Sequence, residues 1–145
     1  MTPYRDAFRS LFDSNMGYRP GERILVFSDL IRDDEAVSDA DRDRRTRLHQ
    51  TTRDLAAFAA QQHGNAGFCD FPATAASGVE PPRALWLAVF GESIITQLEA
   101  ANLMHLLLDK AITPDGLNQA RDIVTAGQTA VANIVIALAN NSTSH

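Results

Sequence analysis

Hydrophobic and polar positions divide the chain into short apolar runs and longer segments with helical spacing. Three runs of strand length are mostly apolar, at residues 23–29, 66–71 and 132–139. Continuous apolar runs of this length are typical of strands that are buried on both faces, as in a parallel sheet. The pattern therefore predicts three strands of the buried type.

Between these runs, apolar residues recur every three or four positions, which predicts helices. The first helix covers the first sixteen residues, with Thr2 as its cap. In the second, Ser38 or Asp39 caps the start and Gly64 ends it. The other predicted helices span 82–91, span 92–109 and begin at Thr113-Pro114.

The second predicted helix has an apolar face and a charged face. The predicted stripe on the inward face consists of Leu48, Thr52, Leu55, Phe58, Ala59 and Gln62. On the exposed face we predict two (i, i+4) ion pairs, Asp41 with Arg45 and Asp43 with Arg47. The preceding segment, residues 32–35, is charged throughout and predicts a solvated loop.

Turn residues and connectivity complete the fold prediction. Arg19-Pro20-Gly21-Glu22 favours a type II turn before the first strand. A strand, a crossover helix and a strand form a right-handed βαβ unit. We predict an α/β fold: an open, three-stranded, mainly parallel sheet with about four to five helices. No helix is predicted after the third strand, so we expect an incomplete layer. Residues 1–145 are then a single α/β domain or the N-terminal portion of a larger two-domain protein.

Composition narrows the classes of protein that fit. Hydrophobic residues make up 45% and charged residues 21% of the 145 positions, as in globular proteins. The net charge of −5 argues against binding nucleic acid through phosphate neutralisation. No apolar run reaches the ~18 residues that cross a bilayer. Cys69 is the single cysteine, so we expect no internal disulfide and a cytoplasmic location.

Polar residues follow each predicted strand, and they are the candidate binding residues. In open parallel sheets, ligands bind beyond the carboxyl ends of the strands. The candidates for substrate binding at this rim are Asp29, Thr74, Ser142, Thr143, Ser144 and His145. The alternative is that Asp29 caps a turn and that the Ser/Thr cluster is a polar loop.

Motifs for other chemistries are missing from the sequence. The acids near Asp29 lack the spacing of a calcium-binding EF-hand loop, and the four histidines lack the spacing of a zinc site. No Gly-x-Ser-x-Gly or Gly-x-Gly-x-x-Gly sequence is present. Cys69 is predicted to be an inert residue of its strand. We assign no catalytic residue and no metal ligand.

Three segments together resemble a known family. Residues 19–26 (RPGERILV) are similar to the Pro-Gly-Glu segment before the first strand of thermophilic-type metalloaminopeptidases, the aminopeptidase T and aminopeptidase S group. Residues 71–74 with 78–86, and residues 134–145 (IVIALANNSTSH), resemble a bacterial, leucyl-aminopeptidase-like branch of that group. The resemblance covers most of the chain.

The resemblance implies a function for a longer protein. Family members remove N-terminal residues from peptides with a pair of divalent metals (zinc, cobalt or magnesium), and they form homodimers. Their metal ligands lie in the C-terminal half and match no position here, so the resemblance implies that this segment supplies cleft wall and domain packing. The chain alone is not expected to hydrolyse peptides. The alternative from another class is a stand-alone α/β module that binds a ligand or protein without catalysis.

Overall fold

The computed structural model describes residues 4–141, and within them the chain forms two compact units. Unit 1 consists of residues 4–73 and 132–140, and unit 2 consists of residues 74–131 and 141. Each unit has its own hydrophobic cluster and is described here by itself.

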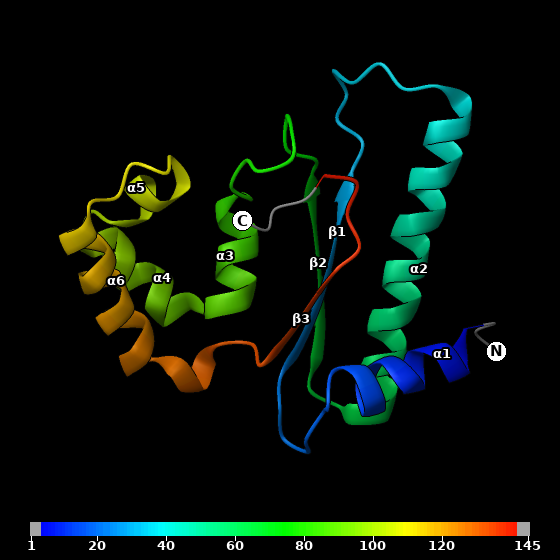
Figure 1. The fold of residues 1–145 in the computed structure, drawn as a ribbon, viewed down its shortest axis with the longest axis horizontal. Coiled ribbons are helices and arrows are strands. Elements are labelled where there is room, and N and C mark those ends of the chain that lie inside the picture. The colour runs from blue at the N-terminus through cyan, green and yellow to red at the C-terminus, as the bar shows by residue number, and fades with distance from the viewer. Residues whose placement is uncertain (1–3, 142–145) are drawn as a thin grey trace. The chain divides into compact units, whose positions relative to one another are not determined.

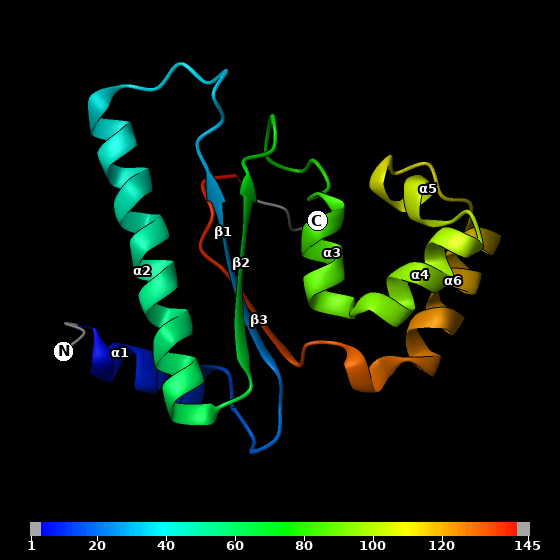
Figure 2. The same ribbon diagram turned by 180° about the vertical axis from the view of Figure 1, so that it is seen from behind.

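Unit 1 contains the sheet (Figures 1 and 2). Its elements are α1 (Arg5–Ser10), a π-helical turn (Leu11–Asn15), β1 (Ile24–Leu30), α2 (Asp39–His63), β2 (Ala66–Pro72) and β3 (Ile134–Ala137). The three strands are parallel in the order β2-β1-β3, so the predicted α/β fold with an open parallel sheet is confirmed. The predicted strand–helix–strand connection is α2, which runs back alongside β1 (Figure 1).

The central strand is β1, and its position explains its composition. Ile24 is in register with both Ala66 and Ile134, so β1 has a partner strand along each edge. Six of its seven residues are buried, as the continuous apolar run predicts. One face of the sheet packs against α1 and α2, and Phe12 and Leu55 lie in this cluster with Ile24.

The third strand differs from the prediction of a strand buried on both faces. β3 is an edge strand of four residues, and Val135 is 38% exposed. An apolar run identifies a segment that suits a sheet, but strand order decides whether it lies at the centre or the edge.

The turn before β1 and the cap of α2 form as the sequence predicts. Glu22 donates its backbone N–H to the carbonyl oxygen of Arg19 at 3.1 Å, and Gly21 has φ +91°. A positive φ at the third position is the mark of a type II turn, and glycine adopts it without strain. Ser38 Oγ accepts from the N–H of Asp41 at 3.1 Å and caps α2. Thr2, the predicted cap of the first helix, lies outside the described residues.

Unit 2 is helical, with α3 (Arg83–Phe90), α4 (Glu92–Ala100), α5 (Met104–Leu108), α6 (Pro114–Ala126) and a 3₁₀ turn (Gln128–Ala130). Its cluster is centred on Ile94, Ile95 and Leu98 of α4. Thr113 Oγ1 accepts from the N–H of Gly116 at 3.1 Å and caps α6 as predicted. No helix in the described part of the chain is long and apolar enough to cross a bilayer.

The single helix predicted over residues 92–109 is instead two helices, α4 and α5. Asn102 has φ +57°, the N–H of Leu103 donates to Leu98 O at 2.9 Å, and the N–H of Asn102 donates to Glu99 O at 3.0 Å. These bonds form a Schellman motif, in which asparagine tolerates the left-handed conformation. Leu98 and Leu103 are both buried in the same cluster, so packing across the break favours ending the helix there.

Candidate functional site

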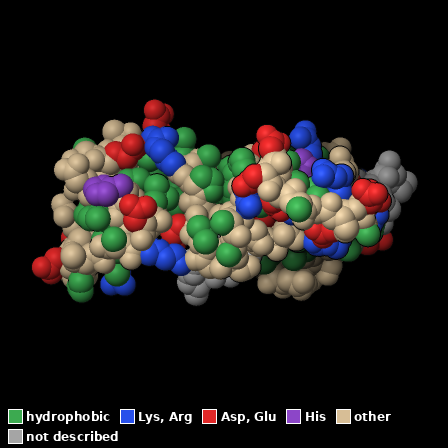
Figure 3. Space-filling model, turned by 90° about the horizontal axis from the view of Figure 1, so that it is seen from above, with side chains coloured by type: hydrophobic (Ala, Val, Ile, Leu, Met, Phe, Trp, Pro, Cys, Tyr) green, Lys and Arg blue, Asp and Glu red, His purple; other side chains and the backbone are tan. Residues whose placement is uncertain are grey.

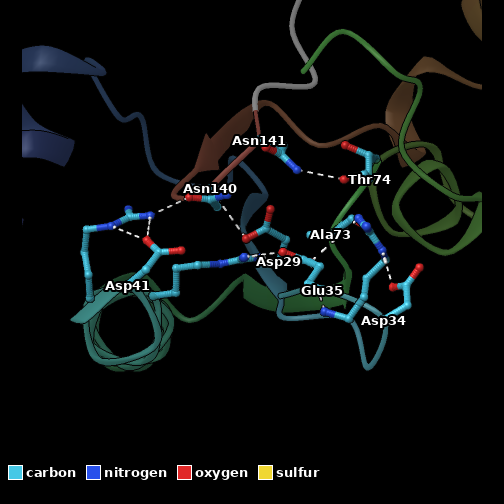
Figure 4. A network of polar contacts seen from close by, with 11 residues as sticks. Asp29, Asp34, Glu35, Asp41, Ala73, Thr74, Asn140 and Asn141 are labelled. Carbon is cyan, nitrogen blue, oxygen red and sulfur yellow. Dashed lines mark hydrogen bonds and ion pairs between the residues drawn. The ribbon is translucent and has the colours of Figure 1, made fainter. Parts of the chain in front are cut away.

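Asp29 lies at the carboxyl end of β1, where it holds the segment that follows β3. Its side chain is buried, and Asp29 Oδ1 accepts from the backbone N–H of Asn140 at 2.9 Å. Asn140 Oδ1 in turn accepts from Arg44 Nη2 of α2 at 2.6 Å. Figure 4 shows Asn140 lying between Asp29 and Asp41. Asn140 therefore links the ends of β1 and β3 to the first turns of α2.

A buried ion pair joins α2 to the segment before it. Arg45 Nη1 lies 2.5 Å from Glu35 Oε2, and Nη2 lies 3.4 Å from Oε1. The Arg45 side chain is 4% exposed and that of Glu35 is 15% exposed. A charge buried to this degree needs its partner, because removing the partner leaves it with neither water nor a counter-ion.

This pair shifts the protonation equilibria of both groups. The hydrogen bond from Arg45 is the main cause that lowers the pKa of Glu35 to about 2 from the usual 4.5, helped by a hydrogen bond from the backbone N–H of Arg32. The same bond raises the pKa of Arg45. Both groups are therefore charged in the folded chain across the physiological range.

The lowered pKa of Glu35 predicts an acid-sensitive contribution to stability. A carboxylate whose pKa is lower in the folded chain than in the unfolded chain stabilises fully above the unfolded pKa, and that contribution is lost as the pH falls through the folded pKa. We expect the free energy difference between the wild type and Glu35→Gln to be constant from pH 7 to about 5 and to shrink toward pH 2. Urea unfolding at a series of pH values measures it. A difference that does not change down to pH 2 would contradict the assignment.

Arg32 holds the loop that presents Glu35. Its Nε donates to Asp34 Oδ1 at 2.8 Å, and its Nη1 donates to the carbonyl oxygen of Ala73 at 3.1 Å. The Arg32 N–H donates to Glu35 Oε1 at 3.0 Å. Figure 3 shows charged side chains of both signs close to one another on the surface of unit 1. The predicted solvated loop is therefore anchored through its charged side chains.

A histidine–carboxylate pair lies on α2 and β2. His49 Nε2 lies 2.8 Å from Asp70 Oδ2, and both side chains are partly buried, at 19% and 32% exposure. The ring of His49 contacts the Phe68 ring edge-on, with centroids 5.7 Å apart. This packing fixes the orientation of the imidazole.

A hollow of about 350 Å³ lies between the end of β1 and the first turns of α2. Its lining residues are Asp29, Leu30, Ile31, Arg45, Thr46 and His49. Arg45 Nε is buried and has no hydrogen-bond partner within residues 4–141. We call this hollow the rim pocket. Its wall offers a carboxylate acceptor, a guanidinium donor and an imidazole.

The candidate binding residues predicted from sequence have different places. Asp29 lines the rim pocket in unit 1. Thr74 comes shortly after β2 and is the first residue of unit 2. Its hydroxyl donates to the carbonyl oxygen of Ala76 at 2.9 Å, and its carbonyl oxygen accepts from Asn141 Nδ2 at 2.7 Å. The others, Ser142, Thr143, Ser144 and His145, lie outside the described residues.

Sequence reasoning missed Arg45, Glu35 and His49. Arg45 was predicted on the exposed face in a pair with Asp41, and that prediction is wrong: Asp41 pairs with Arg44, at 2.5 Å, and Arg45 is buried against Glu35. The spacing contained the signal, because extending the apolar stripe one turn back from Leu48 reaches Arg45. A charged residue on that stripe needs a buried counter-ion.

The described residues do not provide a metal centre. Within residues 4–141 no three His, Cys, Asp or Glu side chains gather as metal ligands. The resemblance itself assigns the metal ligands to no position of this sequence, so no catalytic step is assigned to the described residues. Cys69 is partly buried in β2, and burial is the main cause that raises the pKa of its thiol.

Comparisons of the chain with protein-family models, with curated proteins and with solved structures give no match.

Proposed function

We propose that this chain is the N-terminal α/β segment of a metal-dependent aminopeptidase-like protein that removes N-terminal residues from peptides. In this proposal the segment supplies cleft wall and domain packing, a peptide is the substrate of the whole protein, and the whole protein is a homodimer. The resemblance of residues 19–26 supports it, and these residues form the turn and the first half of the central strand.

The rim pocket carries the proposal, because its chemistry matches the end of a peptide. A peptide N-terminus has an ammonium group and, three bonds away, a carbonyl oxygen. Asp29 supplies a carboxylate for the ammonium group, and carboxylate oxygens accept more than one hydrogen bond each. The Arg45 guanidinium, which lines the pocket, supplies an N–H donor for the carbonyl oxygen. Because Glu35 neutralises Arg45, the Asp29 carboxylate gives the pocket a preference for cations.

Titration with a leucine-containing dipeptide amide, followed by amide NMR shifts, tests this proposal. We expect saturable shifts at residues 29–31 and 45–49, and binding roughly tenfold weaker for the N-acetylated peptide, which has lost its charge. Asp29→Asn should weaken binding of the free amine by a similar factor. Asp33→Asn, which changes an exposed acid in the loop after β1, is the matched control. Equal binding of both peptides, or shifts elsewhere, would contradict the proposal.

The alternative is a stand-alone module that binds a small polar ligand without catalysis, and the same pocket supports it. A module built for a whole small molecule should bind free leucine at least as well as the dipeptide amide. A cleft wall should favour the peptide, which continues beyond the pocket. Neither proposal expects peptide hydrolysis by the isolated chain, and measured hydrolysis would contradict both.

A further inference from the structure

A second hollow lies within unit 2, among its helices, and it is mainly apolar. It has a volume of about 380 Å³, and its apolar lining includes Trp86, Phe90, Leu98, Leu107, Leu117 and Val124. These residues come from α3, α4, α5 and α6, which Figure 1 labels. We call it the helical groove. Its volume is at the lower end of the range of small-molecule sites, and hollows between packed helices are common places for them.

The groove is apolar because of the spacing of residues on α6. Leu117 and Val124 recur at helical spacing, with Ala120 between them as a small residue that leaves room. Leu117 is 36% exposed although it is a large hydrophobic residue. Phe90 and Trp86, on α3, stack with ring centroids 5.4 Å apart. The floor of the groove is therefore an aromatic and aliphatic surface that the described residues of unit 2 leave partly uncovered.

Two residues of this lining carry hydrogen-bond donors without an acceptor among residues 4–141. Trp86 Nε1 is buried and has no partner in the described part of the chain. Arg121 lines the groove, is exposed, and forms no ion pair or hydrogen bond with any described residue. No acidic side chain lines the groove. Arg121 is therefore the group of this lining that can pair with an anionic ligand.

From these observations we propose that the helical groove binds a small amphipathic carboxylate, of the class of medium-chain fatty acids. The apolar tail would cover Leu117 and the Trp86–Phe90 stack, and the carboxylate would accept from the Arg121 guanidinium. A bidentate pair with a guanidinium favours a carboxylate over an alcohol of equal chain length. The small volume favours such a molecule over a helix or a second copy of the chain. This site is separate from the rim pocket and does not depend on the function proposed for it.

Fluorescence provides a direct test, because Trp86 is the only tryptophan in the chain. Sodium decanoate, titrated below micellar concentrations, should change Trp86 emission in a saturable way. Decanol and decylamine, with equal chains but different head groups, should bind roughly tenfold more weakly. Arg121→Gln should reduce decanoate binding to the level of decanol. Arg47→Gln removes an exposed arginine from α2 and should change nothing.

A variant of the apolar floor tests the site independently of Arg121. Leu117→Asp places a negative charge in the groove at a partly exposed position, so the fold should persist while decanoate binding is lost. Equal affinity for decanoate and decanol, or full binding by Arg121→Gln, would overturn the proposal. Trp86 emission that changes with protein concentration alone, and stops changing in Leu117→Asp, would also overturn it by assigning the groove to self-association.

Discussion

Replacing Phe12 with alanine is expected to lower the free energy of unfolding of unit 1 by about 3–5 kcal/mol. The Phe12 ring, on the π-helical turn after α1, is fully buried against α2, stacked on Phe58 at 6.3 Å between centroids and edge-on to His63 at 5.4 Å. Truncation removes this contact area and leaves a cavity that the surrounding aromatic rings cannot close. The loss should be large because unit 1 has a small core.

Hydrogen exchange of the β1 amides measures this effect in unit 1, while Trp86 emission follows unit 2 separately. Tyr4→Ala is the matched control, since Tyr4 is an aromatic residue beside the same helix but is 51% exposed. We expect Tyr4→Ala to cost less than about 1 kcal/mol. If the two variants lose equal protection, Phe12 does not have the packing role described here.

Replacing Glu35 with glutamine is expected to lower the free energy of unfolding of unit 1 by about 2–3 kcal/mol at pH 7. The change leaves the Arg45 guanidinium, 4% exposed, without its counter-ion. The remaining exposure of Glu35 lets water reach part of the site, which keeps the loss below that of a fully buried pair. Asp34→Asn breaks an exposed pair with Arg32 on the same loop and should cost less than about 1 kcal/mol.

A double variant separates the cost of an unpaired charge from the net value of the pair. Replacing Glu35 and Arg45 together with methionine removes both charges, and we expect most of the lost stability to return. Urea unfolding of the wild type, Glu35→Met, Arg45→Met and the double variant gives the coupling energy between the two residues. A double variant as unstable as Glu35→Gln would indicate that loop packing, and not the unpaired charge, causes the loss.

The Glu35–Arg45 ion pair contributes both to the stability of unit 1 and to the wall of the rim pocket. Arg45 lines the rim pocket through a side chain that Glu35 holds in place, and Asn140 ties the segment after β3 to Asp29 in the same pocket. Two segments of unit 1, residues 29–31 and 45–49, therefore line one hollow. A ligand there would contact side chains whose positions depend on the folded loop at residues 32–35.

Much of the fold was predictable because its signals are local. The Pro20-Gly21 turn, the Ser38 and Thr113 caps and the apolar run of β1 each depend on neighbours within a few residues. Such signals act through backbone conformation and nearby hydrogen bonds, which a sequence states directly. The α/β class followed from their order along the chain.

The tertiary structure decided those features that depend on packing between separate helices, strands and loops. The strand order makes β3 an edge strand. Burial of Leu98 and Leu103 in one cluster favours the break after α4. The ion pair with Glu35 allows Arg45 to be buried. Asp29 was predictable as a rim residue, since strand ends are visible in sequence. The hydrogen bond between Asp29 and Asn140 was not predictable, because 111 positions separate the two residues and only the pairing of β1 with β3 brings them together.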